Sequence, residues 1–154
     1  MATNARRCRW DIAPRKKEIE MDKLNEALKT MTFTFFGSGK HKIAPSTHLT
    51  ETNSLFLDVR SNEEFDTIAF SLVHHMPVLH IPIDEIPERV SEIPRDKIVG
   101  VFCSSGVRST MVYLYLRTLG LENVKVIEGG YAELVEEFKP GKLLKHLTKG
   151  ESYK

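Results

Sequence analysis

Short apolar runs alternate with amphipathic segments through most of this chain, and this alternation constrains the fold more than any other feature. An apolar run that almost no polar residue interrupts is typical of a strand buried on both faces of a parallel sheet. The segments between the runs repeat their apolar residues with the period of a helix, and Ser61 followed three residues later by Glu64 predicts a capping box at the start of one of them. We expect strands at residues 54–60, 78–83, 98–102 and 124–130, and helices at residues 61–70, 84–93, 109–120, 131–138 and 141–147. The order predicts an α/β fold of three layers, a central parallel sheet flanked by helices.

A different pattern precedes residue 41. Residues 16–31 space their apolar side chains as a helix does, and TFTFF at residues 32–36 has the composition of a strand. GSGK at residues 37–40 then predicts a turn. We therefore expect an N-terminal extension at residues 1–40 (a basic arm, a helix and a short strand), the main domain at residues 41–148 and a C-terminal tail at residues 149–154.

Composition and charge exclude several classes of protein. A formal net charge of +1 argues against a nucleic-acid-binding protein as a whole. No apolar run reaches the roughly 18–20 residues of a membrane helix, and the N-terminus lacks the apolar core of a secretory signal, so a cytoplasmic location is expected. Residues 1–17 are basic, with Asp11 as their one acidic residue. Such an arm could contact RNA or an acidic partner, although a solvated arm is the simpler interpretation.

The two cysteines, Cys8 and Cys103, match no disulfide framework and no zinc spacing, so both are expected to be free thiols. Cys103 opens the stretch CSSGVRS, between an expected buried strand and an expected helix. Unpaired amides at the start of a helix, together with the helix dipole, favour an anion at this place. Gly106 lets the loop close tightly, and Arg108 adds a permanent cation. These features predict a cysteine whose thiolate is stabilised.

The alternative is that Cys103 is a small buried side chain with a packing role, as most free cysteines are. Ser104, Ser105 and Arg108 argue against it, because a sealed core excludes polar groups that lack partners. The loop also differs from the cysteine loop of some phosphatases, which places five residues between cysteine and arginine, whereas four stand here. Phosphatase chemistry is therefore not expected.

CSSGVRS resembles the active-site loop of single-domain members of the rhodanese family, Cys-x-x-Gly-x-Arg-Ser. Three further stretches resemble the family in the same order: LDVRSNEEF at residues 57–65, VLHIPIDEI at residues 78–86 and VIEGGYAEL at residues 126–134. The resemblance covers about residues 42–140. VHHMP at residues 73–77 departs from the family's Gly-His-Ile-Pro-Gly, and the first 40 residues resemble nothing in the family.

The resemblance implies sulfur transfer without a cofactor. Cys103 would take the outer sulfur of a small donor such as thiosulfate or a persulfide, and the resulting cysteine persulfide would pass it to a thiol or to cyanide. A protein thiol could also be the acceptor. Arg108 would orient an anionic donor and hold the loop. The residues expected to bind the transferred sulfur through the loop are Ser104, Ser105, Gly106, Val107 and Ser109.

The resemblance also implies that Asp58 and Arg60 support the active-site region. We expect Asp58 to accept hydrogen bonds from nearby loops, and Arg60 to pair with Glu64 or another helix carboxylate. An ordinary surface ion pair is an equal alternative for Arg60. The alternative for the whole chain is a binding or sulfur-carrier module without catalysis.

The histidines at residues 74, 75 and 80 invite a metal interpretation. No cysteine or carboxylate accompanies them at a ligand spacing, so no metal site is expected.

Overall fold

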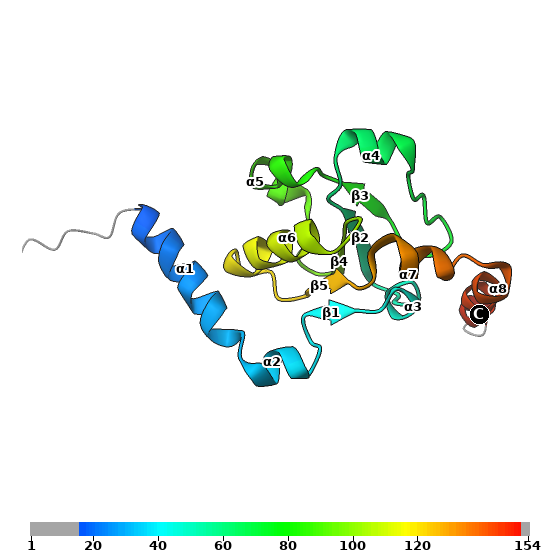
Figure 1. Cartoon of the computed structure of the whole chain (residues 1–154), viewed down its shortest axis with the longest axis horizontal. Helices are drawn as coiled ribbons and strands as arrows, with labels where there is room; N and C mark the ends of the chain where they lie inside the picture. The colour runs from blue at the N-terminus through cyan, green and yellow to red at the C-terminus, as the bar shows by residue number, and fades with distance from the viewer. Residues whose placement is uncertain (1–15, 152–154) are drawn as a thin grey trace, which may run out of the picture.

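The computed structural model describes residues 16–151, so the arm at residues 1–15, which includes Cys8, lies outside the described part. Its centre is a sheet of five strands in the order β1-β5-β4-β2-β3, and every neighbouring pair is parallel. The strands are β1 (Lys42–Ile43), β2 (Ser54–Asp58), β3 (Val78–His80), β4 (Ile98–Phe102) and β5 (Val124–Ile127). The expected parallel α/β architecture is confirmed (Figure 1).

Eight helices and two short 3₁₀ segments are described within residues 16–151. They are α1 (Lys16–Thr30), α2 (Phe33–Gly37), α3 (Pro45–His48), α4 (Asn62–Thr67), η1 (Ile83–Glu85), α5 (Ile86–Arg89), η2 (Val90–Glu92), α6 (Val107–Thr118), α7 (Gly130–Glu136) and α8 (Pro140–Glu151). Over this part of the chain, no helix combines the length and the apolar character that crossing a membrane requires.

The sheet separates two hydrophobic cores, because successive side chains of a strand point to opposite faces. On one face, Leu57 of β2 belongs to a core that includes Leu116 of α6. On the other face, Phe56 of β2 belongs to a core that includes Leu134 of α7. The sheet and the helices on its two sides form the expected three layers.

The N-terminal helices pack on the same face as α6. Helix α1 contacts α6 directly, while reaching beyond the edge of the sheet (Figure 1). Met31 and Phe35 pack against the core on this face. The helix expected at residues 16–31 is confirmed, and the extension is joined to the main domain by apolar contacts.

Residues 33–37 form helix α2, so the strand predicted at residues 32–36 is wrong. The hydroxyl of Thr32 accepts a hydrogen bond from the Phe35 amide at 3.3 Å and thereby caps α2. The rings of Phe35 and Phe36 pack edge to face with one another, and both lie against His41. Capping and local ring contacts outweigh the strand propensity of these residues. The fifth strand is β1, whose two residues are too few to show a period.

Prolines shorten two other predicted elements. The strand expected at residues 78–83 ends at His80. Pro82 follows two residues later and is the N-cap of η1. The helix expected at residues 84–93 is divided into η1, α5 and η2, with Pro87 in the first turn of α5. Proline has no N–H to donate and is tolerated in a first turn but not inside a helix, so a continuous helix cannot form across this segment.

Several boundaries also differ from the predictions. The helix expected at residues 61–70 ends at Thr67, and the strand expected at residues 124–130 ends at Ile127, before the glycine pair. Helix α6 begins two residues earlier than expected, at Val107. At the other end of the chain, α8 continues to Glu151, so residues 149–151 are helical although a tail was expected from residue 149.

The register of β2 and β4 determines where the polar residues emerge. Asp58 at the end of β2 lies opposite Phe102 at the end of β4, and the amide of Val59 donates to the carbonyl of Phe102 at 3.0 Å. Cys103 follows directly. Because parallel strands all end at the same edge, Asp58 and Cys103 lie at the edge where α/β folds bind their ligands.

Candidate active site

The loop after β4 closes tightly before it enters α6. Gly106 stands at the N-cap of α6 with a φ of 92°, in the left-handed region. A glycine reaches this conformation without the penalty that a Cβ atom imposes. The turn directs the first amides of α6 back toward Cys103, as the sequence predicts.

Hydrogen-bond donors surround the sulfur of Cys103. The amide of Gly106 donates to the sulfur at 3.1 Å and the amide of Ser109 donates at 3.4 Å. The thiol itself donates to the Ser109 hydroxyl at 3.4 Å, and after ionisation that hydroxyl can donate to the sulfur instead. Burial opposes ionisation, yet the Ser109 hydroxyl and the amides of Ser109, Ser105 and Gly106 hold the pKa of Cys103 below its usual value.

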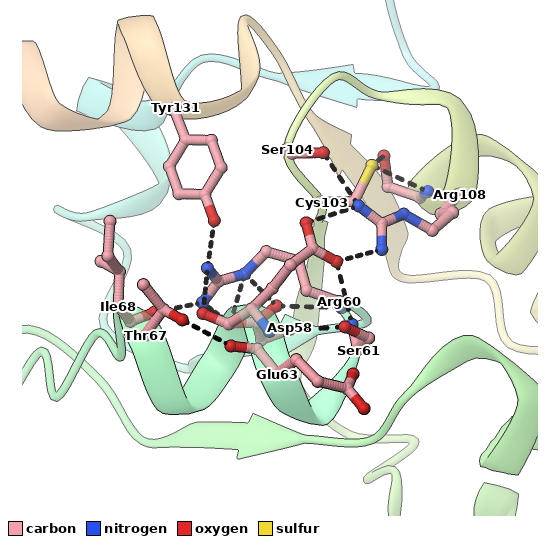
Figure 2. A network of polar contacts seen from close by, with 12 residues as sticks. Asp58, Arg60, Ser61, Glu63, Thr67, Ile68, Cys103, Ser104, Arg108 and Tyr131 are labelled. Atoms are coloured by element: carbon pink, nitrogen blue, oxygen red, sulfur yellow. Dashed lines mark hydrogen bonds and ion pairs between the residues drawn. The ribbon is translucent and has the colours of Figure 1, made fainter.

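Arg108 lies in the first turn of α6 and binds two partners. Its Nη2 donates to the Glu64 carboxylate at 2.9 Å and to the Ser104 hydroxyl at 2.8 Å, and its Nη1 donates to the second carboxylate oxygen of Glu64. Figure 2 shows the guanidinium of Arg108 beside Ser104 and Cys103. The two parallel bonds to one carboxylate fix the guanidinium in place.

Glu64 is a site residue that the sequence did not reveal. The sequence indicated it only as the second member of a capping box and as a possible partner of Arg60. The capping box is confirmed: Ser61 caps α4, and the Glu64 side chain accepts from the Ser61 amide at 3.1 Å. The same carboxylate also binds Arg108, and this bond lowers the pKa of Glu64 to about 2. Glu64 is therefore ionised at neutral pH and carries a full negative charge at the active-site arginine.

Arg60 is completely buried with Asp58, so both the surface ion pair and the pairing with the Glu64 carboxylate are wrong. Arg60 donates to Asp58 from Nε at 2.8 Å and from Nη2 at 2.5 Å. It also donates to the carbonyl of Ile68 at 2.8 Å and to the hydroxyl of Tyr131 (Figure 2). Glu64 offers it only a backbone carbonyl, at 3.4 Å. The guanidinium thus connects the end of β2 with α4 and α7.

Asp58 accepts from the amide of Arg60 at 3.1 Å in addition to the guanidinium, as expected of a residue that orders the chain after β2. His80 at the end of β3 stands 2.9 Å from the Arg60 carbonyl through its Nε2 atom. Its ring stacks on Phe65 of α4, with 4.0 Å between the ring centres. We infer from these contacts that His80 has a packing role and holds α4 against the edge of the sheet.

The turn between β5 and α7 packs directly against the backbone of the Cys103 loop. Gly129 and Gly130 have φ values of 74° and 53°, in the left-handed region that residues with a Cβ atom rarely adopt. A Cβ atom on Gly130 would collide with the carbonyl oxygen of Ser104. The amide of Tyr131 donates to the same oxygen at 3.4 Å. The glycine pair therefore allows direct contact between two backbones, and one of them carries Cys103.

Residues 46–137 match the family model of the rhodanese-like domain. The chain belongs to the rhodanese family. One rhodanese relative, a sulfurtransferase of Allochromatium vinosum, is 36% identical over 86 residues, which cover 55% of this chain and 76% of that protein. A tRNA sulfurtransferase of Mannheimia succiniciproducens is 35% identical over 78 residues, which cover 51% of this chain and only 16% of that protein.

The fold of solved rhodaneses agrees with this assignment. The crystal structure of a rhodanese-related protein from Thermoplasma volcanium has a TM-score of 0.55 and 30% identity, over 65% of this chain and 95% of that one. The family model begins at residue 46, so neither α1 nor α2 belongs to the part that matches it.

The rhodanese loop uses its predicted residues in different ways. Gly106 and Ser109 bind the sulfur, and the amide of Ser105 favours its ionised form. The side chain of Ser104 binds Arg108, and that of Val107 is 59% exposed. Cys103 itself is only 1% exposed, so the residues around it cover its sulfur.

Two of the three histidines that invited a metal interpretation, His75 and His80, have different partners. His75 packs against Phe138 and His146, whereas His80 packs against Phe65. Within residues 16–151, the structure gathers no group of three or more His, Cys, Asp or Glu side chains suited to a metal ion.

Proposed function

We propose that this rhodanese is a sulfurtransferase that carries a sulfane sulfur on Cys103, from a donor such as thiosulfate to a thiophilic acceptor. The observation that carries the proposal is the set of donors around the sulfur, Gly106 at 3.1 Å and Ser109 at 3.4 Å. These groups stabilise a sulfur anion at the start of a helix, where the dipole adds to their effect. The sulfurtransferase relative from Allochromatium vinosum supports the same class of reaction.

The first half-reaction is a nucleophilic displacement at sulfur. The Cys103 thiolate attacks the outer sulfur of thiosulfate, the sulfur–sulfur bond of the donor breaks, and sulfite leaves with the electron pair. The enzyme retains a cysteine persulfide with one negative charge. The loop amides that hold the thiolate are placed to hold this terminal sulfur after a small adjustment.

The second half-reaction returns the enzyme to its starting state. An acceptor thiolate or cyanide attacks the outer sulfur of the persulfide, and the Cys103 thiolate leaves. The products are a new persulfide or thiocyanate, and neither step consumes an oxidant or a cofactor. Separate binding of donor and acceptor predicts ping-pong kinetics. A protein thiol is a further candidate acceptor, and a reducing cytoplasm would keep the thiol of Cys103 available.

Mass spectrometry tests the proposal directly. After incubation with thiosulfate, the wild-type protein should gain the mass of one sulfur atom, and dithiothreitol should remove it. Cys103→Ser should neither gain the sulfur nor form thiocyanate from thiosulfate and cyanide. A wild-type protein that gains no sulfur from thiosulfate, from a thiosulfonate or from an alkyl persulfide would instead support a non-catalytic binding module.

The tRNA in the name of the Mannheimia relative describes that longer protein, of which this chain matches 16%. The basic arm that could contact RNA lies outside the described residues. We therefore include no nucleic acid in the proposed reaction.

A further inference from the structure

The arginine of the active-site loop is already neutralised. Both Nη atoms of Arg108 bind the carboxylate of Glu64, and Nη2 also binds the Ser104 hydroxyl. The Glu64 side chain is about one-third exposed, at 32%, so its carboxylate faces solvent beside the loop as well as the guanidinium. An anionic donor that meets Arg108 therefore meets a carboxylate at the same place.

No second cation offsets this carboxylate among the described residues around the loop. The other guanidinium nearby, that of Arg60, is sealed against Asp58 with no exposed side-chain surface on either residue. A surface hollow beside the site is lined by Glu63, Glu64, Thr67, Ile68 and Tyr131. Two of these residues contact the loop, because Glu64 binds Arg108 and the Tyr131 amide donates to the Ser104 carbonyl. The lining of this hollow carries two carboxylates and no Lys or Arg from the described part of the chain, and the Arg108 guanidinium beside it is already paired with Glu64.

The charges sum to a negative site once Cys103 is ionised. Arg108 and Glu64 cancel, Arg60 and Asp58 cancel, and the thiolate remains as the net charge, stabilised by the loop amides and by the partial charge at the start of α6. Thiosulfate would bring two further negative charges. A donor with a single negative charge would bring one, at a smaller electrostatic cost.

We propose that Glu64 is a specificity-determining residue, which makes this enzyme prefer sulfane donors with at most one negative charge over the dianion thiosulfate. The inference rests on the proposed function, since it concerns the donor of the same Cys103 persulfide. It assigns the donor to the class of alkyl persulfides and thiosulfonates, in which the leaving group carries no more than one charge.

A pair of donors with the same reacting bond isolates this effect. In methanethiosulfonate, the thiolate of Cys103 attacks the outer sulfur, the sulfur–sulfur bond breaks, and methanesulfinate leaves with the electron pair. In thiosulfate the same bond breaks and sulfite leaves. Both reactions yield the same cysteine persulfide, and the donors differ by one unit of charge beside the transferred sulfur.

The test compares kcat/KM for the two donors in wild-type protein, in Glu64→Gln and in Asp66→Asn. Glutamine removes the charge of Glu64 yet can still complete the capping box with Ser61, so α4 keeps its start. Asp66→Asn removes the same charge from an exposed position of the same helix. The ratio of thiosulfate to methanethiosulfonate should rise at least about tenfold in Glu64→Gln. A unit charge at about 6 Å corresponds to roughly a hundredfold at an effective dielectric constant of about 20, and solvent at the partly exposed Glu64 screens part of this effect. Asp66→Asn should leave the ratio unchanged.

A wild-type measurement covers the case in which Glu64→Gln does not fold. The preference of the enzyme for methanethiosulfonate over thiosulfate should exceed, by at least about tenfold, that of 2-mercaptoethanol, a thiol with no other charge. An unchanged ratio in a folded Glu64→Gln, or a wild-type preference no greater than that of 2-mercaptoethanol, overturns the role of Glu64 and leaves sulfur transfer intact. If neither donor places sulfur on wild-type Cys103, the proposed function itself fails.

Discussion

Gly130 lies directly beneath Ser104, so close that a Cβ atom on the glycine would overlap the serine carbonyl oxygen. Gly130→Ala must therefore push the cysteine loop away, and it also places an alanine at a φ of 53°. The left-handed conformation alone costs a non-glycine residue about 1–2 kcal/mol, and the overlap adds to it. We expect sulfur transfer to fall by about tenfold or more, since small displacements of a reacting group are costly. Thiocyanate formation and urea unfolding measure the two effects.

Gly141→Ala is the matched control for this variant. Gly141 lies in α8 with open space around its Cα atom. Alanine should be accepted there with no loss of transfer activity. A Gly130→Ala protein as active as Gly141→Ala would mean that the contact between the two backbones has no importance for the loop.

Ser109→Ala should make the thiol of Cys103 a weaker acid. The variant removes the hydroxyl next to the sulfur and keeps the amide that donates at 3.4 Å. Since hydrogen bonds to an ion are worth more than neutral ones, the pKa of Cys103 should rise toward its usual value. The rate of alkylation by iodoacetamide, followed against pH, gives this pKa. Ser105→Ala, which changes an exposed side chain and keeps its amide, should leave the profile unchanged; equal profiles for all three proteins would contradict the assignment.

The sequence predicted the structure correctly where a single local pattern determines an element. The apolar runs located β2, β4 and β5, and the Ser61–Glu64 spacing located the start of α4. Glycine and arginine at fixed distances from Cys103 predicted the loop. In each case the residues that determine the structure are neighbours in the chain.

What the sequence could not supply were contacts between distant segments. Glu64 and Arg108 are 44 residues apart, and only the pairing of β2 with β4 brings them together. The capping box already explained Glu64, so no signal remained for its second role. In the same way, Tyr131 was visible only as an aromatic residue after a glycine pair, and its bond to the buried Arg60 depends on the position of α7. The strand predicted for TFTFF was wrong for the opposite reason. Here a local contact, the cap formed by Thr32, outweighed the strand propensity of the residues.

Asp58→Ala should destabilise the protein strongly. Neither Asp58 nor Arg60 has exposed side-chain surface, so removal of the carboxylate leaves a buried guanidinium without its counter-charge. Broken pairs of this kind typically cost about 3–5 kcal/mol. The free energy of unfolding in urea measures the loss, and sulfur transfer should fall as well, because Arg60 also holds Tyr131 next to the loop.

Arg89→Ala provides the comparison for an exposed pair. Arg89 binds Glu85 and Glu92 on the surface of α5 and its flanks. Its loss should leave the unfolding midpoint nearly unchanged. Similar midpoints for Asp58→Ala and Arg89→Ala would show that the buried pair does not hold the sheet edge together.

His48 should make stability depend on pH. Its ring is 1% exposed beneath Gly100, where any Cβ atom would strike it, and its Nε2 donates to the Leu55 carbonyl at 3.2 Å. Burial lowers the pKa of His48 from 6.5 to about 4, with only partial opposition from the bond to Leu55. The folded state thus takes up the proton less readily than the unfolded chain. Stability is complete above the unfolded value of 6.5, declines as the pH falls toward 4, and loses no more from this group below it.

The loss attributable to His48 is roughly 3 kcal/mol over this window. His48→Gln separates it from other groups, because glutamine can donate to Leu55 and does not titrate. The pKa of Glu64 is lowered from 4.5 in the unfolded chain to about 2 in the folded protein. The stability that Glu64 contributes is therefore lost only as the pH falls below about 4.5, which lies outside most of the pH range over which His48 acts. Urea unfolding at about pH 7 and about pH 4.5 should therefore show a much smaller loss in His48→Gln than in wild type. If both proteins lose stability equally, protonation of His48 does not oppose folding, and the ring is not sealed from water as the packing against Gly100 implies.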